Sequence, residues 1–131
     1  MIVGIGHDLT PLERMKELLE GKSGIRFQER ILTPNELKAA AEMGGPRLVE
    51  FTAGRFAAKE AVSKAFGCGI GHMLAFSDIE IGRDERGKPL CRLSEKGWER
   101  LGYCAREMVI HVTITHDKSL ASAFVVVERV Q

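Results

Sequence analysis

The sequence has 131 residues, and 44% of them are hydrophobic, so a single domain over residues 1–131 can bury a core without disulfides. The formal net charge is +1, which argues against nucleic acid as a default partner and means that any anion site must be local. Because there is no basic leader segment and no apolar run near the roughly 20 residues of a membrane span, we expect a cytoplasmic protein that does not enter a membrane, with its three cysteines reduced.

The N-terminal segment predicts a strand followed at once by a helix. Ile2–Ile5 is short, apolar and β-branched, which suits a buried strand that delivers Asp8 to its C-terminal end. Thr10-Pro11-Leu12-Glu13 carries the residues of a capping box with proline at the first helical position, and Gly21 ends the predicted helix.

Three further helices are predicted before residue 67. The basic and aromatic segment 26–32 predicts a brief helix. Thr33-Pro34-Asn35-Glu36 repeats the capping-box pattern and opens a helix through about Met43. The longest helix is predicted from about Arg47 to Phe66, where Gly67 ends it.

The second half of the chain predicts a hairpin, one helix and two more strands. Strands are expected at 78–81, 89–93, 109–115 and 121–127, and a helix at 95–101. The polar link 84–88 forms the hairpin turn, and Ser94 caps the helix. Because the last run is almost wholly apolar, we expect that strand to be buried on both faces.

The long helix carries charges that suggest phosphate chemistry. At about 3.6 residues per turn, one face of this helix collects Phe56, Glu60, Ser63 and Lys64. Glu60 and Lys64 can therefore address one small anionic or metal-bound group together. If the first strand packs on this helix, Asp8 can join Glu60 as the pair of oxygen ligands that Mg²⁺ favours.

Each of these residues also has a purely structural interpretation. Asp8 could cap the helix that follows it, and Glu60 with Lys64 could be an ordinary ion pair on a solvated face. His116 could be a polar residue at the end of its strand, and Gly87-Lys88-Pro89 could be only a hairpin turn. Residue chemistry alone leaves these alternatives open.

Basic and aromatic residues gather in and after the first helix. They are Arg14, Lys22, Arg26 and Phe27. The group is either solvated charge or a dock for an acidic partner helix, where complementary charge would steer encounter and orientation more than it would add affinity.

Four motifs in this order resemble the holo-acyl-carrier-protein synthases, the small bacterial type of 4′-phosphopantetheinyl transferase, from one end of the chain to the other. They are Gly4–Asp8, Phe51–Gly71 with its Gly54–Ala61 block, Gly87–Pro89, and His111–His116 before the small residues Ala121–Ala123. The first, second and fourth are highly specific at this spacing.

The resemblance implies an α+β fold, with an antiparallel sheet and one long helix packed on it. It implies a homotrimer with a nucleotide cleft at each subunit interface. It also implies transfer of the 4′-phosphopantetheine arm of coenzyme A to a serine of apo acyl carrier protein, with release of adenosine 3′,5′-bisphosphate. Asp8 and Glu60 match the family's Mg²⁺ ligands, and Lys64 matches a lysine that neutralises diphosphate charge.

The same resemblance implies two further groups of binding residues. Arg47 and Arg55 become candidates for the 3′-phosphate of coenzyme A. Other coenzyme A contacts are expected from Lys64, Gly87, Lys88, Pro89, Thr115 and His116. The surface for the acidic carrier protein is expected at Arg14, Met15, Arg26 and Phe27.

The implied reaction is attack of the carrier serine on the β-phosphorus of coenzyme A. Either Glu60 or a metal-bound water takes the serine proton. Because a tight metal ligand is a poor base, we favour a water that Glu60 orients.

The alternative functions are a non-catalytic nucleotide-binding module and a Mg²⁺-dependent diphosphate hydrolase. The joint presence of Asp8, Glu60 and Lys64 argues against a decayed module.

Overall fold

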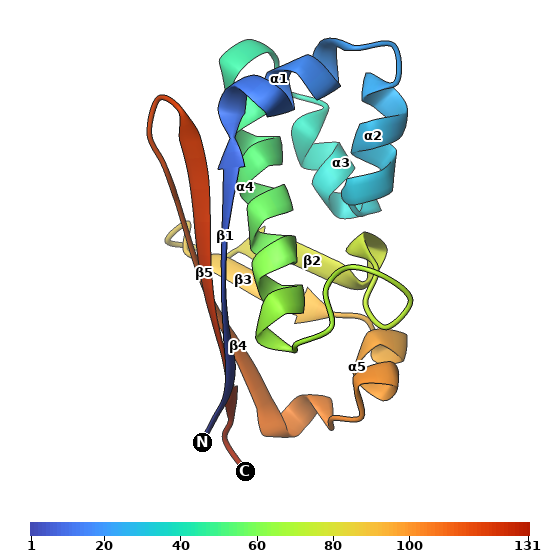
Figure 1. The fold of residues 1–131 in the computed structure, drawn as a ribbon, viewed down its shortest axis with the longest axis vertical. Helices are drawn as coiled ribbons and strands as arrows, with labels where there is room; N and C mark the ends of the chain where they lie inside the picture. Colours follow the sequence, from blue (N-terminus) through green and yellow to red (C-terminus); the bar gives the residue numbers. More distant parts are fainter.

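The computed structural model describes residues 1–131 as an α+β fold in which one long helix packs on an antiparallel sheet (Figure 1). The sheet has the strand order β1-β5-β4, with β1 at Ile2–Pro11, β4 at Met108–His116 and β5 at Leu120–Arg129. Helix α4, Gly45–Ala65, packs against all three strands. The predicted sheet with one long packed helix is confirmed.

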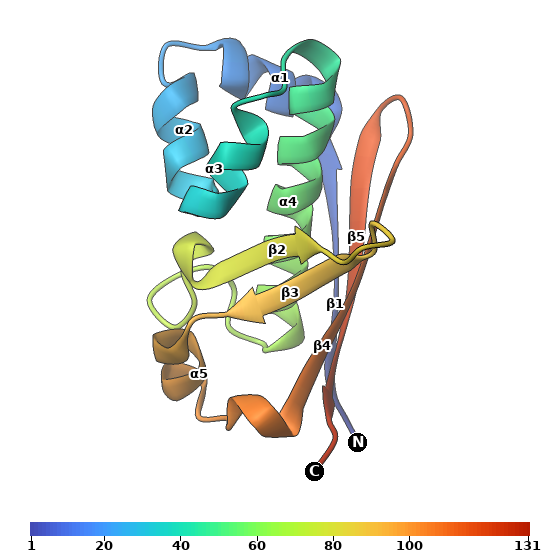
Figure 2. The same ribbon diagram turned by 180° about the vertical axis from the view of Figure 1, so that it is seen from behind.

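The remaining elements surround α4. They are helices α1 (Leu12–Glu20), α2 (Gly24–Ile31), α3 (Pro34–Ala40) and α5 (Glu95–Leu101), the 3₁₀ helices η1 (Phe76–Asp78) and η2 (Ala105–Glu107), and strands β2 (Ile79–Arg83) and β3 (Pro89–Leu93). Helices α1 to α3 gather at one end of the molecule and α5 lies at the other (Figure 2). The β2-β3 hairpin crosses α4 and contacts β4. None of the helices combines the length and the apolar run that a membrane crossing requires.

Local signals in the middle of the chain predict the structure well. Thr33 Oγ1 accepts a hydrogen bond from the backbone of Glu36, and Glu36 Oε1 accepts one from the backbone of Thr33, so the second capping box is confirmed. Ser94 Oγ accepts a bond from Gly97 at 3.0 Å and caps α5 as expected. The predicted hairpin is also formed, whereas α3 ends at Ala40 and not at Met43.

Strand β1 is much longer than its apolar run predicts. It pairs with β5 from Ile2 to Pro11, and this ladder keeps Thr10 in an extended conformation. Helix α1 therefore begins at Leu12, and the capping box predicted at Thr10 is wrong. Thr10 Oγ1 instead donates to Asp8 Oδ2 at 3.3 Å.

Strand β5 is buried on one face only, so the prediction of burial on both faces is wrong. Ala121, Ala123, Val125 and Val127 alternate along it and are fully buried under α4. The opposite side has no helix layer. We call it the open sheet face, and its exposed apolar residues are Ile5, Leu9, Val109 and Phe124.

Small residues let β1 lie directly on α4. A Cβ atom on Gly6 would overlap the carbonyl oxygen of Ala61, and one on Gly4 would overlap that of Ala65. Ala61 is itself fully buried. Only glycine permits this contact, and its consequence is that the end of β1 meets the middle of α4.

Candidate active site

Asp8, near the end of β1, interacts with α4 and not with the helix that follows it. Lys64 Nζ donates to Asp8 Oδ1 at 2.9 Å and to the carbonyl oxygen of His7 at 3.2 Å. The Asp8 side chain is 15% exposed, whereas that of Lys64 is 53% exposed. Asp8 is therefore an ion-pair partner of α4, and the helix-cap interpretation does not hold.

Glu60 shares this corner with Asp8 and Lys64. Burial, and then the negative charge of Asp8, raises the pKa of the Glu60 carboxyl, while the charge of Lys64 opposes the shift. Lys64 pairs with Asp8 and not with Glu60, so the ordinary pair between Glu60 and Lys64 is not formed. The two carboxylates are therefore near enough for their charges to interact, and both line the same cavity.

The donor set suits Mg²⁺ more than a metal that needs a closed protein cage. No group of three or more His, Cys, Asp or Glu side chains is gathered anywhere in the chain. Mg²⁺ is usually held by one or two carboxylates, with waters and substrate phosphates in the other positions. Ser63, predicted on the same face, is buried and donates to the carbonyl oxygen of Glu60, so it is not available to a ligand.

A cavity of about 730 Å³ opens beside the two carboxylates, and we call it the carboxylate pocket. Its residues include Asp8, Glu60, Arg14, Met15, Arg30, Phe27, Phe56, Ile70 and Phe76. The rings of Phe56 and Phe76 lie 5.5 Å apart between centroids, and those of Phe27 and Phe56 lie 6.4 Å apart. The pocket thus combines aromatic and aliphatic side chains with two carboxylates and two guanidinium groups.

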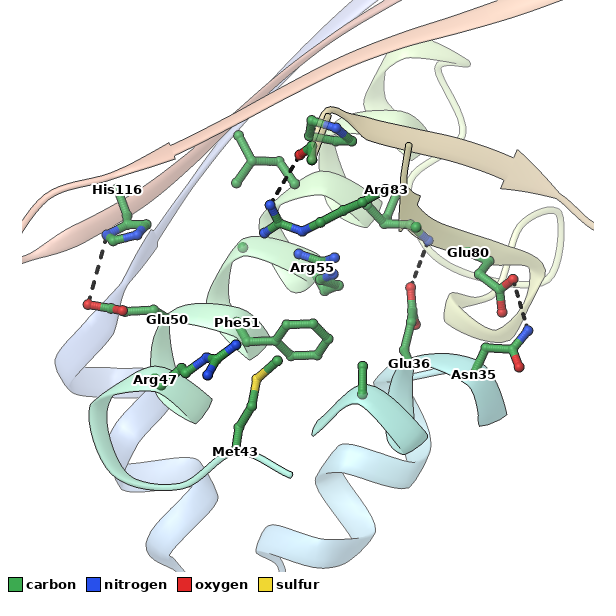
Figure 3. Close-up of a pocket in the computed structure, with 17 residues that line it drawn as sticks. Asn35, Glu36, Met43, Arg47, Glu50, Phe51, Arg55, Glu80, Arg83 and His116 are labelled. Atoms are coloured by element: carbon green, nitrogen blue, oxygen red, sulfur yellow. Dashed lines mark hydrogen bonds and ion pairs between the residues drawn. The ribbon is translucent and has the colours of Figure 1, made fainter. Parts of the chain in front are cut away.

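A second cavity of about 840 Å³ lies elsewhere on α4, and we call it the arginine pocket (Figure 3). Its residues include Arg47, Glu50, Phe51, Arg55, Arg83, Gly87, Pro89 and His116. Two of them, Glu50 and His116, lie 4.0 Å apart between Oε2 and Nδ1. The pocket combines three guanidinium groups with the predicted hairpin turn and strand end.

Arg55 is the unusual residue of the arginine pocket. Only 5% of it is exposed, its guanidinium carbon lies 4.3 Å from the centre of the Phe51 ring, and its Nε has no hydrogen-bond partner. Burial, followed by the charge of Arg83, lowers the pKa of Arg55 to about 10. A buried cation with an unused donor is prepared to bind an anion.

The predicted coenzyme A residues divide between these two places. Lys64 lies beside Asp8, whereas Arg47, Arg55, Gly87, Pro89 and His116 line the arginine pocket. Lys88 and Thr115 are exposed next to it and are not part of its lining. The two pockets share no residue.

Three of the four predicted carrier residues line the carboxylate pocket: Arg14, Met15 and Phe27. Arg26 is exposed on α2 and is not part of the lining. Met15 is only 1% exposed and packs with Leu12, so it supports α1 from below and offers no docking surface.

Several residues of the two pockets were not predicted. Arg30 and Phe76 line the carboxylate pocket, and Arg83 lines the arginine pocket. Arg83 Nη1 also donates to the carbonyl oxygen of Gly87 at 3.2 Å, which fixes the hairpin turn. The basic run around Arg30 was the only sequence signal for any of them.

A sequence model of the 4′-phosphopantetheinyl transferase superfamily matches residues 4–121. The holo-[acyl-carrier-protein] synthase of Bacillus cereus strain G9842 is 50% identical over 128 residues, which cover 98% of this chain and 97% of that protein.

Solved structures agree with the sequence comparison. The holo-(acyl-carrier-protein) synthase of Bacillus anthracis, in complex with CoA (3′,5′-ADP), has a TM-score of 0.84 and 46% identity and covers 98% of both chains. The Helicobacter pylori holo-[acyl-carrier-protein] synthase with coenzyme A has a TM-score of 0.81 and 32% identity, over 95% of this chain and 99% of that one. The chain therefore belongs to the 4′-phosphopantetheinyl transferase superfamily, among its holo-[acyl-carrier-protein] synthases.

Proposed function

We propose that this enzyme transfers the 4′-phosphopantetheine arm of coenzyme A to a serine of apo acyl carrier protein in a Mg²⁺-dependent reaction. The observation that carries the proposal is the meeting of Asp8 and Glu60 in the lining of the carboxylate pocket, where Asp8 also pairs with Lys64. The Bacillus anthracis and Helicobacter pylori relatives were solved with coenzyme A or its 3′,5′-ADP part, which supports the same ligand here.

Asp8 and Glu60 would hold the magnesium ion. Bound there, Mg²⁺ would neutralise and orient the diphosphate of coenzyme A for in-line displacement. Lys64 has an exposed side chain, so it can leave Asp8 and bring its ammonium group to the phosphate of the leaving group, where negative charge develops during the reaction. Phe27 and Phe56 would hold the apolar part of the arm within the pocket.

The chemical step forms one bond and breaks one. The serine hydroxyl oxygen binds the β-phosphorus, and the bond from that phosphorus to the bridging oxygen breaks, so that adenosine 3′,5′-bisphosphate leaves. The serine proton passes to a water that Glu60 orients and from there to solvent.

Mass spectrometry of apo acyl carrier protein tests the proposal directly. Incubation with the enzyme, coenzyme A and Mg²⁺ is expected to add one phosphopantetheine to the carrier, and chelation of the metal is expected to stop the reaction. Release of pantetheine phosphate without a carrier would instead identify a diphosphate hydrolase. Coenzyme A binding without either product would identify a non-catalytic module.

We further propose a homotrimer in which each active site combines the carboxylate pocket of one subunit with the arginine pocket of its neighbour. Within one chain the two pockets share no residue, so neither alone offers both the carboxylates and the buried guanidinium. The open sheet face supports assembly, because Ile5 and Leu9 are 61% and 54% exposed there. A mass three times that of the chain in light scattering is expected.

Arg55 is expected to bind the 3′-phosphate of coenzyme A. Arg55→Ala should raise the KM for coenzyme A by roughly ten- to a hundredfold, because a charge-assisted contact is worth about 1.5–3 kcal/mol. The KM for dephospho-coenzyme A, which lacks this phosphate, should stay the same. An equal rise in KM for both substrates would show that Arg55 does not bind the 3′-phosphate.

The same variant tests the shared site. Asp8→Ala and Arg55→Ala proteins damage different pockets, so unfolding and refolding them together should produce interfaces with both pockets intact. Part of the wild-type activity at low coenzyme A is expected to return. Each variant refolded alone is the control, and no gain on mixing would place both pockets of one site in a single chain.

Arg14 is expected to dock the carrier. Arg14 is exposed on α1 at the mouth of the carboxylate pocket, and acyl carrier proteins are acidic helical bundles. Arg14→Glu should raise the KM for the carrier by about tenfold or more, since like charges replace attraction, and leave the KM for coenzyme A unchanged. Lys16→Glu, on the same helix but outside the pocket, is the matched control.

A further inference from the structure

A buried ion pair between Lys59 and Glu36 lies between the two pockets. Lys59 is 0% exposed, and its Nζ donates to Glu36 Oε1 at 2.6 Å, to the carbonyl oxygen of Ile31 at 2.7 Å and to that of Phe76 at 3.2 Å. All three partners are acceptors, which matches the three donors of an ammonium group. The side chain is therefore fully used, and none of it is left for a ligand.

The carboxylate of Glu36 is equally occupied. Its Oε1 accepts from Lys59 and from the backbone N–H of Thr33, and its Oε2 accepts the backbone N–H of Ile81 at 2.7 Å. The pair thus joins α4 to the end of α2, the start of α3, the 3₁₀ helix η1 and strand β2.

The partners of this pair are wall residues of both pockets. Ile31 and Phe76 line the carboxylate pocket, whereas Ile81 and Glu36 line the arginine pocket. Figure 3 shows Glu36 among the side chains of that second pocket. Lys59 is also the residue directly before Glu60. A shift of the ammonium group would move Ile31 and Phe76 in one pocket and Glu36 in the other.

We propose that Lys59 and Glu36 are positioning residues that hold the walls of the two pockets in register with α4, and so set the alignment of the substrate arm and the affinity for coenzyme A. The kinetic part of this inference rests on the proposed transferase function. A pair that only stabilised the fold would change the folded fraction and leave each folded molecule fully active and fully able to bind.

Lys59→Met removes the charge and all three donors at nearly constant volume. We expect kcat per folded molecule to fall about tenfold and the Kd for coenzyme A, measured by calorimetry, to rise severalfold. The melting temperature should also fall, since Glu36 is left buried without its partner.

Two further variants separate positioning from stability. Lys59→Met with Glu36→Gln removes the uncompensated charge, so the melting temperature should recover in part while kcat and the coenzyme A Kd do not. Val62→Ala, a fully buried residue of α4 that lines neither pocket, should lower the melting temperature with wild-type kcat and Kd.

The kcat and the coenzyme A Kd of these variants decide whether the pair positions the pocket walls. The inference would be wrong if folded Lys59→Met had wild-type kcat and Kd. It would also be wrong if both values recovered together with the melting temperature in the double variant. In either case the pair would only stabilise the fold. If the wild-type protein transferred nothing, the proposed function would fail, and the coenzyme A Kd of Lys59→Met against Val62→Ala would still judge the positioning role by itself.

Discussion

Replacing Asp8 with alanine is expected to lower the rate of phosphopantetheine transfer by about a thousandfold, or roughly 4 kcal/mol of transition-state stabilisation. The substitution removes one of two carboxylates that would hold the magnesium ion and also frees Lys64 from its 2.9 Å contact. Glu60→Ala should have an effect of the same size. Transfer measured at saturating coenzyme A, carrier and Mg²⁺ tests both.

Neither substitution should harm the fold. Asp8 and Glu60 line a pocket and are not part of the buried hydrophobic core, and the ion pair that Asp8→Ala removes involves a half-exposed lysine and is worth little. Either substitution also removes the repulsion between the carboxylates, which adds to the effect of burial in raising the pKa of Glu60. Circular dichroism melting is expected to match the wild type or exceed it. Glu99→Ala, an exposed carboxylate on α5, is the control, and full activity in either site variant would remove the metal assignment.

Replacing Gly6 with alanine is expected to destabilise the protein by about 3 kcal/mol or more. The added methyl group would overlap the carbonyl oxygen of Ala61, and a helix backbone has no rotamer by which it could move aside. Strand β1 must then lift from α4, which separates Asp8 from Glu60. We therefore expect a lower midpoint in urea denaturation and a loss of transfer even in the folded fraction.

Gly71→Ala provides the matched control for Gly6→Ala. Nothing lies within 4 Å of a Cβ at Gly71, so the change should stay within about 0.5 kcal/mol of the wild type. If Gly6→Ala were as stable and as active as Gly71→Ala, the close contact of β1 with α4 would not be what locates Asp8.

Local sequence signals predicted the elements that depend on local contacts. The Thr33–Glu36 capping box and the Ser94 cap use bonds within four residues, and both are formed. The length of β1 could not be predicted in this way, because glycine and polar residues interrupt its apolar run. Its conformation comes from pairing with β5, more than a hundred residues away.

In the candidate site, too, the sequence predicted the local features but not those that depend on tertiary contacts. Glu60 and Lys64 are one turn apart, so their spacing could be recognised, but their meeting with Asp8 depends on a strand packed on a helix. Burial alone distinguishes Lys59 from the exposed lysines of the chain, and its partner Glu36 is read from sequence only as a capping residue. The position of Asp8 beside Glu60 and the ion pair between Lys59 and Glu36 could therefore be found only in the tertiary structure.

The packing of β1 on α4 also has a thermodynamic consequence. Because the backbone holds Glu60 in a partly buried position beside Asp8, its desolvation and then its repulsion from Asp8 enter the folding free energy before any ligand arrives. A Glu60 pKa that is raised above its unfolded value means that this group weakens the fold as pH rises through that range. A cation that binds only the folded chain reverses the effect by linkage, so metal, proton and folding equilibria are coupled at one corner.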